Sequence, residues 1–111
     1  SDLYGKALEH FIALELRAYL SYRRKFLTLS YWQAKNGQEV DFIIGDEIAI
    51  EVKSSHQITD KHLKGLRFLG EEKICNRYII ISNDKIARKV GNIEILHWEV
   101  FLNKLWEDKI L

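Results

Sequence analysis

The segment Gln38–Ser55, QEVDFIIGDEIAIEVKSS, constrains the fold of this chain more than any other part of the sequence. Two runs rich in branched residues flank Gly45-Asp46-Glu47, and a three-residue loop with a glycine is a common connection between antiparallel strands. We therefore expect a tight β-hairpin. Because side chains alternate along a strand, one face of this hairpin is predicted to be wholly apolar and to consist of the cross-strand pairs Val40–Val52, Phe42–Ile50 and Ile44–Ile48.

The opposite face of the hairpin is predicted to carry the pairs Glu39–Lys53, Asp41–Glu51 and Ile43–Ala49. Carboxylates directly opposite each other repel, and a bound divalent cation would reverse the sign of that interaction. Ile43 and Ala49 make the face partly apolar, so we expect it to be covered, and charges on a covered face need a partner. The alternative to a ligand-binding site is an ordinary half-buried strand whose charged face is solvated and carries a Glu39–Lys53 ion pair. A slip of one residue would destroy this pattern.

Nine residues separate Asp41 from Glu51-Val52-Lys53. This spacing resembles the core of the PD-(D/E)XK nuclease superfamily, which has the restriction-endonuclease-like fold. More narrowly, Gly5-x-x-x-Glu9, GQEVDFII, IEVKSS and KGLRFL together resemble the C-terminal domain of a prokaryotic group of putative AAA+ ATPases, a domain described as of unknown function. The resemblance extends from Gly5 to about Leu105. It implies a cytoplasmic protein in which an ATPase module precedes this domain in the same polypeptide.

The resemblance also implies roles for particular residues. Asp41 and Glu51 would bind Mg²⁺ or Mn²⁺, with the Val52 carbonyl as a further oxygen, and such hard cations prefer oxygen ligands. Lys53 would orient the attacking water and balance the phosphate charge. Glu9 would reach the metal directly or through water, although an exposed helix carboxylate is the alternative for it.

Hydrolysis of DNA phosphodiester bonds is the leading functional hypothesis. The rival is a non-catalytic module that binds nucleic acid or a protein beside the ATPase. Superfamily members often act as dimers, which leaves a homodimer open here.

Composition supports one domain over residues 1–111. Hydrophobic residues make up 47% and charged residues 30%, and no apolar run approaches a membrane span, so no membrane partner is expected. The single cysteine, Cys75, fits a reducing cytosol. The chain begins at Ser1 and has no Met, so we expect it to be part of a longer polypeptide. It has no Gly-rich phosphate loop, so any ATPase activity would belong to the other part.

Periodicity and turn residues predict the other elements. Together they give an α/β fold with a restriction-endonuclease-like core: a mixed central sheet, made of an antiparallel three-strand meander plus a parallel strand, flanked by helices. The first helix, capped by Ser1 and Asp2, is predicted to bury one side, which is marked by Tyr4, Leu8, Phe11, Glu15 and Ala18 and broadened by Ile12, Leu16, Tyr19 and Leu20. The last helix is predicted to turn Val100, Phe101, Leu105 and Trp106 inward. The expected segments are a helix to Tyr22, a strand at Phe26–Ala34, a turn at 35–37, a helix at Thr59–Glu71, a strand at Arg77–Ser82, a short helix at Asp84–Val90, a strand at Ile93–Leu96 and a helix at Trp98–Lys109.

Basic side chains gather in two places. Lys61, Lys64 and Arg67 lie at three-residue spacing along the helix after the hairpin, where they form either a solvated face or a contact with a nucleic-acid backbone. Arg17 and the run 23–25 lie near the end of the first helix, where basic residues suit the helix dipole or contact phosphate. The net charge of +1 favours neither reading.

Overall fold

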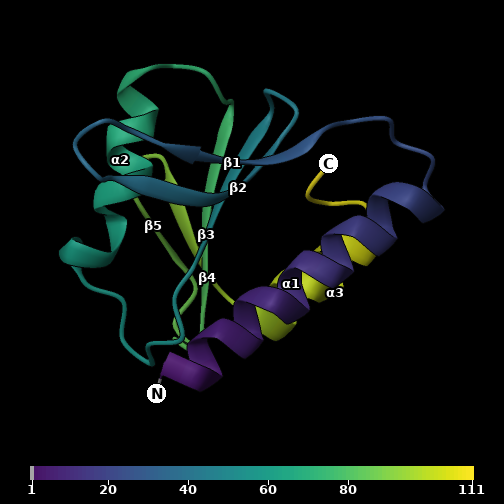
Figure 1. Cartoon of the computed structure of the whole chain (residues 1–111). Helices are drawn as coiled ribbons and strands as arrows, with labels where there is room; N and C mark the ends of the chain where they lie inside the picture. Colours follow the sequence, from purple (N-terminus) through teal and green to yellow (C-terminus); the bar gives the residue numbers. More distant parts are fainter. Residues whose placement is uncertain (1) are drawn as a thin grey trace.

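The computed structural model describes residues 2–111, so the cap predicted at Ser1 lies outside the described residues. A six-stranded mixed sheet lies between helices, with strand order β1-β2-β3-β4-β6-β5 (Figure 1). The elements are α1 (Asp2–Tyr22), β1 (Leu29–Gln33), β2 (Glu39–Ile44), β3 (Ile48–Val52), the 3₁₀ helix η1 (Asp60–Leu63), α2 (Lys64–Glu71), β4 (Arg77–Ser82), β5 (Arg88–Val90), β6 (Ile93–His97) and α3 (Trp98–Trp106).

The sheet confirms the predicted antiparallel meander and the predicted parallel strand beside it, and contains a second parallel strand, β6. β1, β2 and β3 pair antiparallel, β4 lies parallel to β3, and β6 lies parallel to β4. The prediction of a short helix at residues 84–90 is wrong, because β5 pairs antiparallel with β6 at the edge of the sheet. Gly91 has a φ of +61° in the turn that joins these two strands, which favours a hairpin there.

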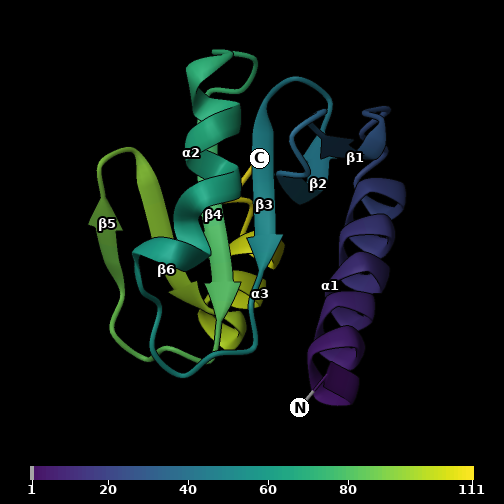
Figure 2. The ribbon, with the colours of Figure 1, turned by 60° about the vertical axis from the view of Figure 1, so that its left-hand side comes forward.

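Helices cover both faces of the sheet, and each face has its own apolar core. Helices α1 and α3 lie on one face, and η1 with α2 lies on the other (Figures 1 and 2). The β2–β3 hairpin contributes to both cores, with Ile50 and Ile44 on the α1 side and Ile43 and Ala49 on the α2 side. Across residues 2–111, no helix has the length and apolarity needed to cross a membrane.

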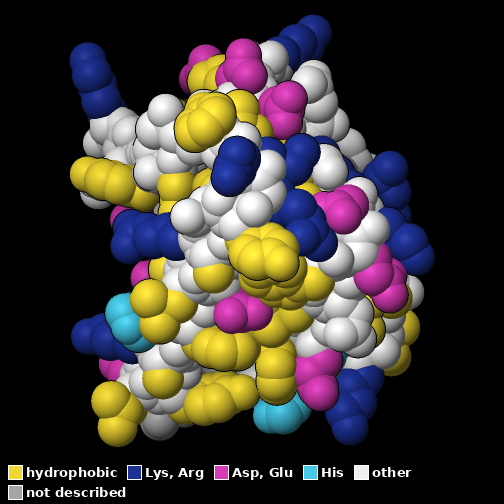
Figure 3. Space-filling model, turned by 90° about the vertical axis from the view of Figure 1, so that its right-hand side faces the viewer, with side chains coloured by type: hydrophobic (Ala, Val, Ile, Leu, Met, Phe, Trp, Pro, Cys, Tyr) yellow, Lys and Arg dark blue, Asp and Glu magenta, His cyan; other side chains and the backbone are white. Residues whose placement is uncertain are grey.

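Helix α1 buries an apolar stripe that lies within the surface predicted from the sequence. Its buried residues are Leu8, Ile12, Leu16, Tyr19 and Leu20. Tyr4 and Phe11, which were predicted to face inward, are 46% and 41% exposed. The reason is that α1 packs along β3 and α3 and leaves its outer side open; Phe11 lies there edge to face with Trp98, with ring centroids 5.9 Å apart. Exposed hydrophobic side chains are visible over this face in Figure 3.

Helix α3 is shorter than predicted because the chain turns at Asp108, whose φ is +62°. One oxygen of this carboxylate accepts hydrogen bonds from Tyr19 Oη at 2.6 Å and Arg23 Nε at 2.9 Å, which ties the end of the chain to α1. Phe101 is fully buried as predicted, whereas Val100 is 39% exposed and its predicted inward position is wrong.

Candidate functional site

The hairpin has the predicted register, but its strands separate at the acidic pair. Phe42 lies opposite Ile50 and Ile44 lies opposite Ile48, as predicted. Beyond Phe42 the ladder of backbone pairs ends, and side chains replace it. The Asp41 N–H donates to Glu51 Oε1 at 3.1 Å, and the Val52 N–H donates to Asp41 Oδ2 at 2.8 Å. Each carboxylate therefore satisfies a backbone donor of the opposite strand.

This opening changes the predicted apolar face at one position. Val40 packs with the α2-side core and not with Phe42 and Ile44, so its predicted place on their face is wrong. The alternation fails here because β2 also follows β1, whose register shifts between Ser30 and Trp32. Val40 lies opposite Trp32, which packs against the α2-side core.

Two of the acidic residues, Asp41 and Glu9, are held where they resist ionisation. Burial, followed by a hydrogen bond with Glu51 and its charge, raises the pKa of Asp41 from 3.8 to about 7. Burial, followed by the charge of Asp41 and a hydrogen bond with it, raises the pKa of Glu9 from 4.5 to about 7. Although Glu9 as a residue is exposed, its carboxyl group is thus coupled to Asp41. Glu51, at 5% exposure, completes a row of three interacting carboxyl groups.

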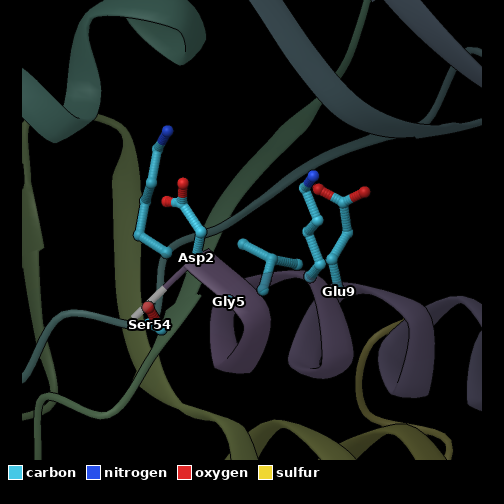
Figure 4. Close-up of a pocket in the computed structure, with 7 residues that line it drawn as sticks. Asp2, Gly5, Glu9 and Ser54 are labelled. Atoms are coloured by element: carbon cyan, nitrogen blue, oxygen red, sulfur yellow. The ribbon is translucent and has the colours of Figure 1, made fainter.

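Helix α1 brings Glu9 to the opened end of the hairpin. Gly5, one turn before Glu9, faces the segment after β3, and a Cβ at Gly5 would lie 3.4 Å from Ser54 Oγ. Asn83, after β4, fixes this contact because its amide donates to the Ser54 carbonyl at 3.0 Å and to Tyr4 Oη at 3.1 Å. Figure 4 shows Asp2 and Glu9 projecting to the same side of α1.

Helix α2 closes the other side of the hairpin through a glycine. A Cβ on Gly65 would collide with the carbonyl oxygen of Glu39 and would lie 3.7 Å from Glu51 Oε2. Only glycine therefore lets α2 approach the acidic pair this closely. Lys53 Nζ lies 3.8 Å from Glu51 Oε2, so the described ion pair of Lys53 is with Glu51 and not with Glu39, its predicted cross-strand partner.

Two hollows of similar size flank the site, and Lys53 lines both. The first, beside α1, has a volume of about 250 Å³, and the second, beside α2, has a volume of about 260 Å³. The α1 hollow is lined by Asp2, Gly5, Lys6, Glu9, Val52, Lys53 and Ser54 (Figure 4). The α2 hollow is lined by Gly37, Gln38, Glu39, Glu51, Lys53, Lys61, His62, Lys64 and Gly65.

The three basic residues singled out on the second helix separate in the structure. Lys61 and Lys64 line the α2 hollow, whereas Arg67 donates to Asp60 at 3.2 Å. Sequence reasoning missed His62, which lies between the two lysines and lines the same hollow. The signal for it was local: Thr59 precedes η1, and His62 three residues later completes a capping box.

The structure therefore brings together, at the opened end of the hairpin, the residues to which the sequence resemblance assigned roles: Glu9, Asp41, Glu51 and Lys53. Their carboxylates do not converge on one point: within the described part of the chain, no group of three or more His, Cys, Asp or Glu side chains is arranged to hold a metal ion. The two carboxylates that lie against each other are Asp41 and Glu51.

The fold and site define an α/β domain with paired carboxylates and a lysine at the open end of a β-hairpin. The family model for a domain of unknown function (DUF4143) matches residues 4–101, and the chain belongs to this family. No curated protein and no solved structure gives a significant match to the chain.

Proposed function

We propose that this domain is a metal-dependent nuclease of the PD-(D/E)XK type that hydrolyses DNA phosphodiester bonds and is joined to an AAA+ ATPase module. One observation carries the proposal: Asp41 and Glu51 lie together beside Lys53, between two open hollows. Burial first, and then the neighbouring carboxylates, raise the pKa values of Asp41 and Glu9, so a bound cation would stabilise their ionised forms.

The donor chemistry fits a hard divalent cation such as Mg²⁺ or Mn²⁺. The backbone hydrogen bonds use Asp41 Oδ2 and Glu51 Oε1, and the second oxygen of Glu51, Oε2, lies 3.8 Å from Lys53 Nζ. Asp41 and Glu51 would hold the ion, with the Val52 carbonyl and Glu9 as further oxygen sources. A cation bound there would lower the pKa of water and stabilise charge on a phosphate.

The chain's own residues then supply position and charge. Lys53 places an ammonium group beside Glu51, where it can orient the attacking water and balance the phosphate. Glu9, whose pKa is about 7, can take up or release a proton near neutral pH. In the hydrolysis, the water oxygen adds to phosphorus, one P–O ester bond breaks, and the leaving oxygen gains a proton.

The second candidate is a non-catalytic binding module, and the hydrogen bonds of the acidic pair favour it. Asp41 and Glu51 complete the opened hairpin by accepting from Val52 N and Asp41 N, which is a reason for both carboxylates to be present without turnover. The two functions differ in whether the carboxylates must be charged. An amide oxygen accepts the same backbone hydrogen bonds but is a weaker ligand for a divalent cation.

The test is calorimetric titration of Mn²⁺ into the wild type, Asp41→Asn and Asp46→Asn. Asp46 is an exposed carboxylate in the loop of the same hairpin and serves as the matched control. We expect saturable binding in the wild type and in Asp46→Asn, and loss of binding in Asp41→Asn. Cleavage of branched, single-stranded and duplex DNA should follow the same pattern. Absence of Mn²⁺ binding by the wild type, with and without DNA, would refute the nuclease and leave the binding module.

A further inference from the structure

The α2 hollow contains cationic and neutral donors that the proposed hydrolysis does not use. Lys61 and Lys64 line it together with Lys53, which it shares with the α1 hollow. Its acidic members are Glu39 and Glu51, and Glu51 is already paired with Lys53 at 3.8 Å. The two remaining lysines therefore outnumber the one remaining carboxylate, which favours an anionic ligand.

His62 adds a directed donor to this hollow. Its Nδ1 accepts a hydrogen bond from the Thr59 backbone N–H at 2.9 Å. Because a backbone N–H can only donate, Nδ1 must be unprotonated, and the neutral ring then carries its proton on Nε2. Burial, followed by the charges of Lys61 and Lys53, lowers the pKa of His62 and keeps the ring in this neutral form near pH 7.

The lining also limits what the ligand can offer. Within the described residues, neither hollow is lined by Phe, Tyr or Trp, the large aromatic side chains on which a nucleobase stacks. The contacts available in the α2 hollow come from ammonium, imidazole and amide donors, which suit phosphate oxygens. Lys53, between the two hollows, places this group of donors directly beside the acidic pair.

We propose that Lys61, His62 and Lys64 form a phosphate subsite for the nucleotide next to the reacting phosphodiester, so that a DNA strand is recognised through its backbone and not its bases. The identity of this ligand rests on the proposed nuclease function. The subsite itself requires only that a strand with successive phosphates crosses Lys53, and it therefore applies equally to a binding module.

Binding of fluorescein-labelled 20-nucleotide DNA, measured by anisotropy in EDTA, separates the subsite from cleavage. Lys64→Gln is expected to weaken binding about three- to tenfold and to reduce the salt dependence by about one phosphate contact. Arg67→Gln is the matched control, because it makes the same charge change on the same helix while Arg67 is paired with Asp60 outside the hollow. The DNA affinity of this variant should remain within about twofold of that of the wild type.

His62→Asn tests the imidazole donor without removing the cap. The Asn side-chain oxygen can accept from Thr59 N–H in place of Nδ1, whereas the Nε2–H is lost. We expect weaker binding with an unchanged salt dependence, because the donor removed is neutral. In the wild type, the His62 Nε2 resonance in ¹H–¹⁵N spectra should shift when the dinucleotide pTpT is added. The affinities of oligonucleotides that differ in base composition should lie within about threefold of one another.

The possible outcomes test the subsite and the nuclease separately. If Mn²⁺-dependent cleavage occurs but His62→Asn and Lys64→Gln bind DNA like the wild type, the subsite is wrong and the nuclease stands. If DNA binding depends on both residues but no metal binds, the subsite stands and the nuclease is wrong. Three results would each overturn the subsite. The first is a strong base preference, and the second is failure of the wild type to bind both DNA and RNA of the same sequence. The third is a His62 resonance that does not move when pTpT is added.

Discussion

Asp41→Asn should stabilise the metal-free protein at alkaline pH, and the size of the effect follows from the pKa of Asp41. Burial and Glu51 raise this pKa from 3.8 to about 7. Each unit of pKa corresponds to about 1.4 kcal/mol, so keeping Asp41 ionised in the folded state costs about 4 kcal/mol. Relaxation of the opened hairpin would lower this cost.

The direction of the pH dependence follows from proton binding. Between the unfolded pKa near 3.8 and the folded pKa near 7, the folded protein binds more protons at Asp41 than the unfolded chain does. Stability is therefore greatest below the unfolded pKa and is lost as the pH rises through the folded pKa. From pH 5 to pH 8, the wild type should lose roughly 2 to 3 kcal/mol through this one carboxyl group.

Urea unfolding followed by tryptophan fluorescence, in EDTA at pH 5 and pH 8, measures this loss. Asn at position 41 keeps an oxygen acceptor for Val52 N–H but has no charge, so Asp41→Asn should lose about 2 to 3 kcal/mol less than the wild type over the same interval. Asp46→Asn, in the exposed hairpin loop, should lose as much as the wild type. Equal losses in the wild type and Asp41→Asn would refute the argument that Asp41 is forced to ionise against burial and Glu51.

Three further predictions concern the supports of the site and its ligand. Gly65→Ala should destabilise the protein by about 1 to 3 kcal/mol in urea unfolding because its methyl group meets the Glu39 carbonyl, whereas Gly70→Ala, with nothing nearer than 3.9 Å, should be stabilising or neutral. Arg77→Ala should cost about 2 to 3 kcal/mol by the same assay, because Arg77 donates twice to Glu94, and a loss below about 0.5 kcal/mol would contradict this. Mn²⁺ at about 100 times its Kd should stabilise the wild type at pH 8 by about 2.7 kcal/mol and should leave Asp41→Asn unchanged.

The features predicted correctly from the sequence are those that neighbouring residues determine. The loop at Gly45, the register of Phe42 with Ile50 and the buried strand at residues 77–82 follow from turn chemistry and side-chain alternation. The same local reasoning failed at residues 84–90. There, Asp84 accepts from Ile86 N–H and starts a turn, and the strand that follows exists only because β6 pairs with it.

The opening of the hairpin could not be predicted, because distant elements produce it. Gly65 on α2 lies against the Glu39 carbonyl, and the register of β1 with β2 shifts between Ser30 and Trp32, opposite the part of β2 between Val40 and Ile43. Alternation therefore predicted that Asp41 and Glu51 lie opposite each other, but not that each accepts a backbone hydrogen bond from the other strand. His62 was missed for a related reason: the local capping box with Thr59 predicts only its place at the start of η1, whereas the packing of η1 beside the hairpin brings it to the hollow.

These hydrogen bonds change how the acidic pair bears on function. From sequence alone, two facing carboxylates are a cost that only a ligand can explain. In the structure, each carboxylate has one oxygen on a backbone N–H, so the pair stabilises the opened hairpin even without a ligand. Their presence is therefore not sufficient evidence of catalysis. The two functions differ in whether the carboxylates beside Lys53 must be ionised. A nuclease needs Asp41 and Glu51 charged so that they can bind a cation. A binding module keeps its fold and its DNA affinity when Asp41 is replaced by an amide.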